Sequence, residues 1–476
     1  MDHSRVKIVA TLGPATESPR TLEALVAAGV DVVRLNMSHG TRAQHVQLLA
    51  ASRAVAADLG KNVAVMADLG GPKIRIGRLR GGGPVQIETG GRLAVVAADV
   101  EGTATEISCN NPAILAELRP GASILLDDGR ITLRVVEAEP GRVLTEVVEG
   151  GPLGEHKGFT SPGIGAHIPS LTEKDREDLR WAVEAGVDLV ALSFVRKAHD
   201  IRITKALIGS LGADTPVLAK IEKQEAVDDL DAILEACDGV MVARGDLALE
   251  TSIESVPVFQ KEIIRRANAA AKPVITATEM LQSMTDSPRP TRAEAADVAN
   301  AVLDGTDAVM LSAETSVGRY PVEAVTIMDR IIQRTELVAR SRELGRRGDR
   351  HLAAGMEGDA MAVAAAGVVA AEEVGAGVIG VISASGAMVR AVAALRPRCA
   401  IFGFTASDMV ARRLALVWGV TAVALGSVES LAECRWRAVD HVENEAGVRS
   451  GDRIVIVSGK GLEEAVAARM EVVVAV

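Results

Sequence analysis

The chain has 476 residues, a length that predicts about three domains or one large β/α barrel with added modules. Its formal net charge of −11, without a long basic run, argues against binding to nucleic acids or acidic membranes. No apolar run reaches ~18–20 residues, so we expect no membrane span. The N-terminus lacks a signal-peptide pattern and the 4 cysteines form no CxxC pair, so we expect a cytoplasmic protein with reduced thiols.

Short strands and helices alternate in the first 72 residues. Apolar runs predict strands at 6–12, 31–38 and 62–69, and helical spacing predicts helices at 21–28 and 42–59. Such alternation is typical of parallel βαβ units.

The alternation stops after Pro72. Residues 73–164 are rich in glycine and in short runs of Val, Ile and Thr, and few of their segments have helical spacing. We therefore expect an inserted all-β lid domain there, in the form of a small β-barrel.

The alternation resumes at residues 172–175, where Thr172 and Asp175 resemble a helix capping box. Five further strands are predicted at 188–195, 216–222, 239–246, 273–280 and 307–314. With the three earlier strands they make eight. The fold class that we expect is therefore α/β: a (β/α)8 TIM barrel of residues 1–72 and 165–345, with the lid domain inserted after strand 3.

The composition changes again at a polar linker near residues 346–349. Beyond it, apolar runs predict strands at 378–383, 400–405, 420–425, 453–458 and 471–476, with helical stretches between the first four. This pattern predicts a C-terminal three-layer α/β domain of residues 350–476.

Polar and charged residues gather at the carboxyl ends of seven predicted strands, where barrels of this class carry their catalytic side chains. The set comprises Thr11, Arg34, Asn36, Ser38, His39, Asp68, Lys220, Glu222, Asp246, Thr276, Thr278, Ser312 and Glu314. Two carboxylates beside a lysine, as in Lys220, Glu222 and Asp246, suit a divalent cation that bridges to phosphate oxygens. A structural ion pair at the barrel rim explains that trio equally well when it is taken alone.

The motifs that contain these residues resemble those of pyruvate kinases over essentially the whole chain. The matching stretches are residues 7–14, 34–40, 68–75, 126–129, 220–222, 243–246, 276–281, 288–294 and 310–315. The resemblance implies transfer of the phosphoryl group of phosphoenolpyruvate to ADP, giving pyruvate and ATP at the end of glycolysis. It also implies a homotetramer, as is common in the family.

The resemblance assigns the phosphoryl-transfer roles by matching position. Glu222 and Asp246 would hold Mg²⁺ or Mn²⁺, and Lys220 and Arg34 would bind the phosphoryl group in transfer. Backbone amides at Gly245 and Asp246 would hold the substrate carboxylate. These roles agree with a reaction that depends on positioning and charge stabilisation.

The resemblance also assigns the remaining steps. Thr278 would lie near the enolate carbon and Ser312 would complete a water-linked proton relay, because a hydroxyl alone is a poor general acid. The positions on the nucleotide side are Thr11, Pro14, His39, Arg75 and Lys157. The lid would close on the nucleotide, with hinges near Pro72 and Gly165.

Three departures from the family pattern change the expectations. Lys73 stands where many relatives have glutamate and bind K⁺, so its ammonium group would replace that ion and make the enzyme largely independent of K⁺. The alternative is a solvated surface lysine. Glu279 replaces the usual glutamine, and strand alternation is expected to turn it away from Thr278. Thr160 replaces a usual asparagine of the lid. The K⁺ ligands of relatives match Asn36, Ser38, Asp68 and the carbonyl of Leu69.

The C-terminal domain resembles the effector domain of the family. Its phosphate loop matches Ser383, Ser385 and Gly386, whose amides lead into a predicted helix. Ala387 and Met388 replace the expected cation and hydroxyl, which argues against activation by fructose-1,6-bisphosphate. A sugar monophosphate, a nucleotide or no effector stay as alternatives.

Two other classes of function fit the motifs less well. A lyase that handles phosphoenolpyruvate or pyruvate would use the Glu222 and Asp246 pair, but it would need neither a nucleotide lid nor Lys157. A non-catalytic relative should have lost Lys220 or a metal-binding carboxylate, and all three are present.

Overall fold

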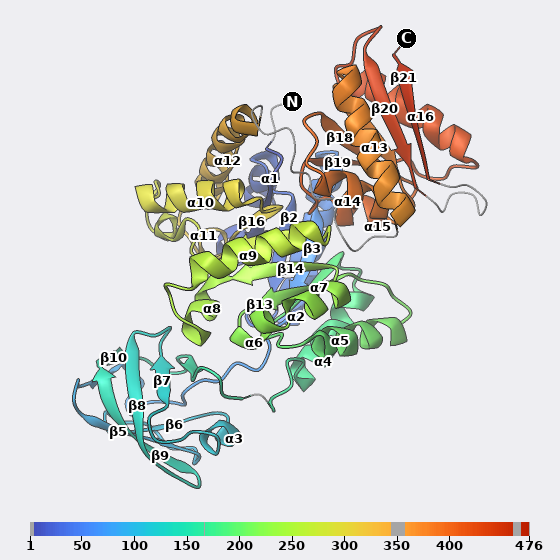
Figure 1. The fold of residues 1–476 in the computed structure, drawn as a ribbon. Helices are drawn as coiled ribbons and strands as arrows, with labels where there is room; N and C mark the ends of the chain where they lie inside the picture. Colours follow the sequence, from blue (N-terminus) through green and yellow to red (C-terminus); the bar gives the residue numbers. More distant parts are fainter. Residues whose placement is uncertain (1–3, 166, 344–357, 460–467, 476) are drawn as a thin grey trace.

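The computed structural model describes residues 4–165, 167–343, 358–459 and 468–475 (Figure 1). Eight parallel strands close into a barrel in the order β1-β16-β15-β14-β13-β12-β3-β2. They are β1 (Lys7–Thr11), β2 (Val32–Asn36), β3 (Ala64–Asp68), β12 (Leu189–Leu192), β13 (Val217–Ile221), β14 (Gly239–Ala243), β15 (Val274–Ala277) and β16 (Ala308–Leu311). The predicted barrel is confirmed, and the linker predicted at 346–349 lies outside the described residues.

Helices follow the barrel strands and form an outer ring. They are η1 (Pro14–Thr16), α1 (Pro19–Ala27), α2 (Arg42–Asp58), α4 (Glu173–Glu184), α5 (Ala198–Ser210), α6 (Gln224–Asp228), α7 (Leu230–Ala236), α8 (Arg244–Glu250), α9 (Val256–Ala269), η2 (Gln282–Thr285), α10 (Arg292–Asp304), α11 (Ala313–Ser316) and α12 (Pro321–Glu343). At the start of α4, Thr172 and Asp175 form the predicted capping box. None of the helices in the described ranges is long and apolar enough to cross a bilayer.

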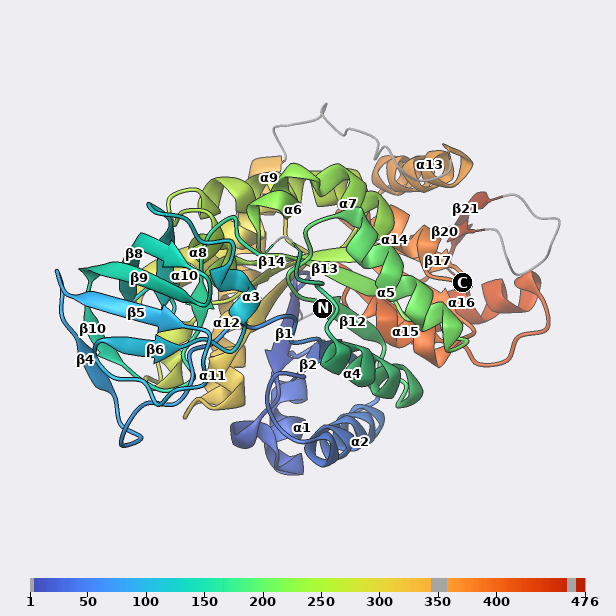
Figure 2. The same ribbon diagram turned by 90° about the horizontal axis from the view of Figure 1, so that it is seen from below.

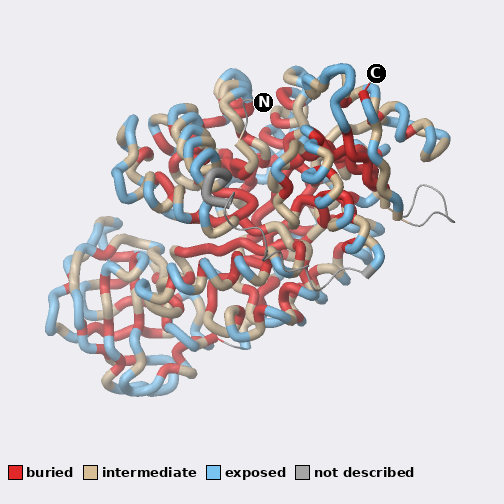
Figure 3. Tube along the Cα trace, turned by 45° about the horizontal axis from the view of Figure 1, so that its top comes forward, coloured by how far each residue is buried: buried red, intermediate tan, exposed pale blue. Residues whose placement is uncertain are grey.

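Alternating strand residues fill the barrel interior and its outer layer. Val9 of β1 packs inside the barrel with Met66 and Met241, whereas its neighbours Ile8 and Ala10 pack outward against the helices. The strands are consequently buried along almost their whole length, with only Asn36 partly exposed (Figure 3). Most polar side chains of the barrel strands lie in their carboxyl-terminal halves, as Arg34, Asp68, Lys220 and Thr276 do.

The inserted domain lies between β3 and α4 and is built almost entirely of strands. It comprises β4 (Val85–Ile87), β5 (Arg92–Val96), β6 (Glu106–Ser108), the short helix α3 (Pro112–Leu115), β7 (Ser123–Leu126), β8 (Ile131–Glu139), β9 (Arg142–Glu149), β10 (Gly151–Leu153) and β11 (Phe159–Thr160). These strands form a six-stranded sheet, β11-β7-β8-β9-β5-β6, and a separate pair, β10-β4. The two sheets enclose one apolar core, but they do not join into the closed small barrel that we expected.

The C-terminal domain has the predicted three layers. A sheet in the order β19-β18-β17-β20-β21 has α13, α14 and α15 on one face and α16 on the other. Its elements are α13 (Gly358–Val374), β17 (Val378–Ile382), α14 (Ala387–Ala394), β18 (Ala400–Thr405), α15 (Asp408–Leu414), β19 (Val420–Ala424), α16 (Leu431–Glu445), β20 (Arg453–Ser458) and β21 (Arg469–Val474). The lid and this domain lie at opposite ends of the barrel (Figures 1 and 2).

Four aspartates bind the starts of barrel strands, and two of them, Asp188 and Asp307, also bind the C-terminal domain. One oxygen of each accepts the N–H at the start of a neighbouring strand, at 2.7–2.9 Å: Asp31 from Ile8, Asp188 from Val65, Asp238 from Val217 and Asp307 from Val274. The other oxygens face Lys7, Arg412, Lys205 and Arg396, respectively. Because Arg396 and Arg412 belong to the C-terminal domain, that domain is bound to the strand starts.

We expect Asp188→Asn to destabilise the protein by about 3–5 kcal/mol, because it leaves two arginines without their buried anion. Asp188 is fully buried between Arg53, at 2.7 Å, and Arg412, at 2.8 Å. Calorimetric unfolding should show a clearly lower midpoint. The control Asp214→Asn removes an ion pair whose aspartate is 79% exposed, and it should cost at most about 1 kcal/mol. Equal shifts for the two variants would contradict the role of Asp188.

Candidate active site

Lys220, at the end of β13, lies at the centre of a buried polar cluster. Its Nζ contacts Glu222 Oε1 at 2.8 Å, Ser193 Oγ at 2.7 Å and Asp68 Oδ1 at 3.5 Å. Burial alone would lower the pKa of Lys220, but the carboxylates of Asp68 and Glu222 outweigh it and raise the pKa. The ammonium group is therefore charged; it donates a hydrogen bond to Ser193 and forms ion pairs with the two carboxylates.

Asp68 holds a second cation in the same cluster. Its Oδ2 accepts from Arg34 Nε at 2.6 Å, and Arg34 also donates to Thr11 Oγ1 at 3.0 Å. Burial opposes the charged form of Asp68, yet Lys220 and Arg34 hold its pKa below the ordinary value. Thr11 itself is buried and donates to the carbonyl of Leu311, so it supports Arg34 from behind.

Glu222 and Asp246 are the two carboxylates that could hold a divalent ion. Glu222 Oε2 accepts the N–H of Phe194 at 2.7 Å, whereas its Oε1 has Lys220 as neighbour. Burial, and then the neighbouring Glu222, raise the pKa of Asp246 to about 6. Within the described ranges, no group of three or more His, Cys, Asp or Glu residues could enclose a metal. Two carboxylates fit Mg²⁺, which usually takes its remaining ligands from water and substrate phosphate.

The raised pKa of Asp246 gives a pH-dependent metal affinity. Because a proton and the metal ion compete for this carboxylate, the apparent affinity for Mn²⁺ should fall about tenfold per pH unit below about pH 6 and level off above it. Titration with Mn²⁺ followed by electron paramagnetic resonance measures this dependence. Asp246→Asn should bind weakly at every pH, and a flat profile in the parent protein would contradict the assignment.

Thr278 and Glu279 follow β15 in the left-handed region, with φ of 67° and 55°. The strand ends at Ala277, so the expectation that strand alternation turns Glu279 away from Thr278 is wrong. The turn brings Thr278 Oγ1 to 2.9 Å from the N–H of Gly245, from which it accepts a hydrogen bond. Thr278 in turn donates to the carbonyl of Ala277 at 2.6 Å, so a substrate carboxylate bound by these two groups would replace both hydrogen bonds.

Two other predicted residues at strand ends stabilise the barrel rim. Thr276 is buried and donates to Thr306, and Glu314 accepts the N–H groups of Leu281 and Ser312. The Ser312 hydroxyl is buried, and no hydrogen-bond partner is found for it in the part of the chain that the structure describes. Of Thr276, Glu314 and Ser312, only Ser312 therefore has a hydroxyl group that is free to donate in a proton relay.

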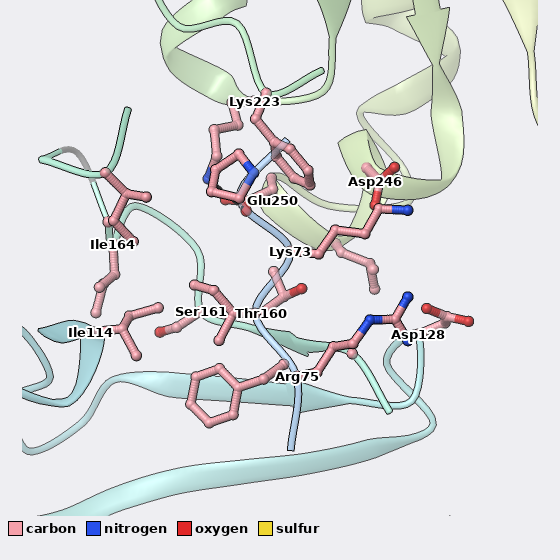
Figure 4. Close-up of a pocket in the computed structure, with 18 of the residues that line it drawn as sticks. Lys73, Arg75, Ile114, Asp128, Thr160, Ser161, Ile164, Lys223, Asp246 and Glu250 are labelled. Carbon is pink, nitrogen blue, oxygen red and sulfur yellow. Dashed lines mark hydrogen bonds and ion pairs between the residues drawn. The ribbon is translucent and has the colours of Figure 1, made fainter. Parts of the chain in front are cut away.

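Three of the four expected K⁺ ligands already have protein partners. The carbonyl of Leu69 accepts from Ser193 Oγ at 2.7 Å, Asp68 pairs with both cations, and Asn36 Oδ1 accepts from the N–H of Ser38 at 3.1 Å. Lys73 is exposed as a residue, which is the feature expected for a solvated surface lysine. Burial of its ammonium group and then the nearby Lys220 nevertheless lower its pKa, while Asp246 and Asp68 oppose that shift. The side chain of Lys73 extends toward Asp246 (Figure 4).

A cavity of about 280 Å³ separates the lid from the barrel (Figure 4). Lys73, Asp246 and two residues predicted on the nucleotide side, Arg75 and Lys157, line it, whereas Thr11, Pro14 and His39 do not. Arg75 donates to the carbonyl of His156 at 2.8 Å, and Lys157 pairs with Asp127 at 2.8 Å.

Burial, and then Lys73 and Arg75, lower the pKa of His39, so this ring is neutral.

Both connections to the lid are tied to the barrel. The N–H of Gly71 donates to Asp175 at 3.1 Å, and Arg196 donates to the carbonyls of Gly165 and Ile168. Ser193 and Arg196 were missed by the sequence analysis. Both lie after β12, the strand end that contributed no residue to the predicted set. Their position in the barrel was the signal that would have identified them.

The predicted effector loop lies in the C-terminal domain, between β17 and α14. Ser383 is buried, Gly386 has a φ of 76°, and Arg390 donates to the carbonyl of Ser385 at 3.4 Å. None of these residues lines the cavity at the lid. The structure therefore separates this loop from the catalytic cluster.

Two family models match the chain: the pyruvate kinase barrel domain over residues 3–325 and the pyruvate kinase alpha/beta domain over residues 361–473. The chain is 43% identical to pyruvate kinase 2 of Synechocystis, covering 96% of this chain and 76% of the relative. It is 44% identical to pyruvate kinase of Agrobacterium vitis, covering 96% and 94%. A crystal structure of a pyruvate kinase from Cryptosporidium parvum superposes with a TM-score of 0.89 at 32% identity, covering 100% of this chain and 96% of that one.

Proposed function

Because this chain belongs to the pyruvate kinase family, a family of phosphotransferases, we propose that Lys220, Glu222 and Asp246 carry the transfer of the phosphoryl group from phosphoenolpyruvate to ADP. The single observation that supports this assignment most is the convergence of the three residues at the strand ends beneath the lid. The products are pyruvate and ATP.

Lys220 and Arg34 stabilise the charge of the phosphoryl group during transfer. Both side chains are fixed by Asp68, so they need little reorganisation when charge develops on the phosphoryl oxygens. The N–H of Lys220 that faces Asp68 at 3.5 Å is its weakest contact and is the one to turn toward the substrate. When bound at Glu222 and Asp246, Mg²⁺, which the family generally uses, would neutralise substrate charge.

The enolate product must be protonated at its terminal carbon. Thr278 positions the substrate carboxylate together with the Gly245 amide, and the free hydroxyl of Ser312 begins a relay of hydroxyl groups and water toward solvent. A relay is needed because a threonine or serine hydroxyl is too weak an acid to supply the proton alone.

Lys73 replaces K⁺ in this enzyme. Its ammonium group is close enough to Asp246, Asp68 and Lys220 for each to affect its pKa. Three of the four expected K⁺ ligands, Asn36, Asp68 and Leu69, have protein partners. This ammonium group would supply a positive charge near the phosphoryl site without a monovalent ion.

A coupled assay with phosphoenolpyruvate and ADP tests the reaction. Pyruvate should form only when ADP and Mg²⁺ or Mn²⁺ are both present, in an amount equal to the ATP formed. Pyruvate released without ADP would favour a lyase or phosphatase activity instead. Inactivity with both substrates present would favour the non-catalytic reading.

We expect Ser193→Ala to lower kcat about 10–100-fold, because Ser193 fixes Lys220 by accepting from its Nζ while donating to the Leu69 carbonyl. Affinity for Mn²⁺ should be kept. The matched control is Ser210→Ala, which removes an exposed hydroxyl that donates to a backbone carbonyl at the same distance of 2.7 Å. An unchanged kcat for Ser193→Ala would show that Lys220 needs no such support.

Three further properties remain predictions for this chain. They are the homotetramer, the cytoplasmic location and a phosphorylated effector at Ser383, Ser385 and Gly386. The loop geometry supports the last, because Gly386 ends the turn directly before α14. Phosphoenolpyruvate saturation curves with and without sugar phosphates or nucleotides would test it.

A further inference from the structure

Arg244 is a buried arginine that the reaction described above does not use. It is the first residue of α8, directly before Gly245 and Asp246, and its side chain is only 9% exposed. It is not among the described residues that line the cavity at the lid. Because a buried guanidinium group is stable only when it is paired and hydrogen-bonded, the partners of Arg244 show what it holds in place.

The turn after β15 accepts two hydrogen bonds from Arg244. Its Nη2 donates to the carbonyl of Thr278 at 2.6 Å, and its Nε donates to the carbonyl of Ala277 at 3.2 Å. Thr278 is β-branched and has a φ of 67°, a conformation that persists only where the surrounding structure fixes it. Hydrogen bonds from a charged donor are stronger than those between neutral groups, so Arg244 is a main support of this turn.

The same guanidinium group is anchored to two outer helices. Its Nη1 and Nη2 each lie 2.8 Å from an oxygen of Asp297 on α10, which makes a two-point ion pair. Its Nη1 also donates to Gln260 of α9 at 3.3 Å. All three nitrogens therefore have protein acceptors, so Arg244 acts on a substrate only through the residues that it holds.

Substrate binding would make this support more important. Thr278 Oγ1 accepts from the N–H of Gly245 and donates to the carbonyl of Ala277, and a carboxylate bound by Thr278 and Gly245 would replace both hydrogen bonds. The hydrogen bonds from Arg244 go to backbone carbonyls, so they would be kept. Because Arg244 also directly precedes Gly245, one residue fixes the two parts of this subsite relative to each other.

We propose that Arg244 is a positioning residue for the protonation step: it holds the Thr278 turn against the Gly245 amide without contacting substrate. In this step, a proton from solvent forms a C–H bond at the terminal carbon of the enolate, and the enolate oxygen becomes the ketone oxygen of pyruvate. Displacing the turn by about 1 Å would slow such a step about 10²-fold. The effect on protonation rests on the proposed function, but the support of the turn does not.

Exchange of the methyl protons of pyruvate for deuterium isolates this step, because a site that protonates the enolate also removes a methyl proton in the reverse direction. Followed by NMR in D₂O with Mg²⁺ and ATP, the exchange rate of Arg244→Gln should fall about 10²-fold. Its kcat for ATP formation should fall only about tenfold, because an enolate that leaves the site is protonated by solvent. Affinity for Mn²⁺ should be kept.

The matched control is Arg53→Gln, at the other end of the barrel. Arg53 donates to the carbonyls of Val63, at 3.3 Å, and Gly186, at 2.9 Å, and it pairs with Asp188 at 2.7 Å. It therefore holds two carbonyls and one aspartate, as Arg244 does. Arg53→Gln should lower the unfolding midpoint but leave the ratio of methyl exchange to kcat unchanged, because a general loss of stability does not change that ratio.

Hydrogen–deuterium exchange measured by mass spectrometry tests the support of the turn without catalysis. In the full-length protein without substrates, the segment 277–285 should take up deuterium about tenfold faster in Arg244→Gln, and at the parent rate in Arg53→Gln. If Arg244→Gln does not fold, Arg244→Lys should show the same losses. A lysine can pair with Asp297, but its single nitrogen cannot also reach both carbonyls.

Methyl exchange at the parent rate in Arg244→Gln or Arg244→Lys, or a turn segment with unchanged deuterium uptake, would overturn the role of Arg244. Equal losses of methyl exchange and kcat in Arg244→Gln would contradict a specific effect on protonation. A parent protein that neither forms ATP nor exchanges the protons of pyruvate would instead count against the proposed function, and faster uptake at the turn in Arg244→Gln would still support its anchoring by Arg244.

Discussion

Lys220→Ala should lower kcat about 10²–10³-fold or more while metal binding at Glu222 and Asp246 is largely kept. The substitution removes a fixed positive charge that contacts the phosphoryl group most strongly in the transition state. The coupled assay gives kcat, and Mn²⁺ titration gives the metal affinity. Turnover comparable to that of the parent protein would show that Lys220 is not part of the reaction.

The same substitution should also reveal the cost of the buried cluster. Without Lys220, the carboxylate of Glu222 loses its cation, and Asp68 retains only Arg34. We expect the metal-free variant to lose about 3–5 kcal/mol of stability and to regain part of it when Mn²⁺ is added. The control is Lys261→Ala, which removes an ion pair whose lysine is 60% exposed and should change neither kcat nor, by more than about 1 kcal/mol, stability.

Lys73→Glu is expected to convert a K⁺-independent enzyme into one that requires K⁺. In the parent protein, replacing tetramethylammonium by K⁺ should raise the rate less than about tenfold, because Lys73 supplies the positive charge. In the variant, the rate without K⁺ should fall about 10²-fold or more and recover substantially when K⁺ is added. The steady-state rate in the two salts at equal ionic strength measures both effects.

A charge change of the same size elsewhere controls for electrostatics at long range. Lys197→Glu alters an exposed lysine and should leave the rate and its salt dependence unchanged. A parent enzyme that is activated at least about tenfold by K⁺, or a Lys73→Glu variant that K⁺ fails to rescue, would contradict the replacement of the ion by Lys73.

The barrel could be predicted from the sequence because its signals are local. Each strand is a run of apolar residues, and the polar residues that end it must lie at the same rim in a parallel barrel. Thr172 and Asp175 likewise form their capping box within one turn of chain. Lys220, Glu222 and Asp246 needed only the order of the strands to be placed together.

Other features depend on neighbours that are distant along the chain. Ser193 acquires its role from Lys220 and the Leu69 carbonyl, 27 and 124 residues away. The left-handed turn at Thr278 and Glu279 cannot be read from the residues, because neither side chain favours it. Thr11 matched a nucleotide-side position, yet packing behind Arg34 decides what it contacts.

The aspartates at the strand starts have a mechanical consequence. The strands that they precede, β12 and β16 among them, run without interruption to Ser193 and Ser312 at the far rim. If the C-terminal domain tilted, Arg396 and Arg412 would displace Asp307 and Asp188, and the strands β16 and β12 would move with them. Because packed interiors are nearly incompressible, a displacement of a few tenths of an ångström at the strand starts would also shift Ser193 and Ser312 at the catalytic end of the barrel. No ligand would need to move between the two ends.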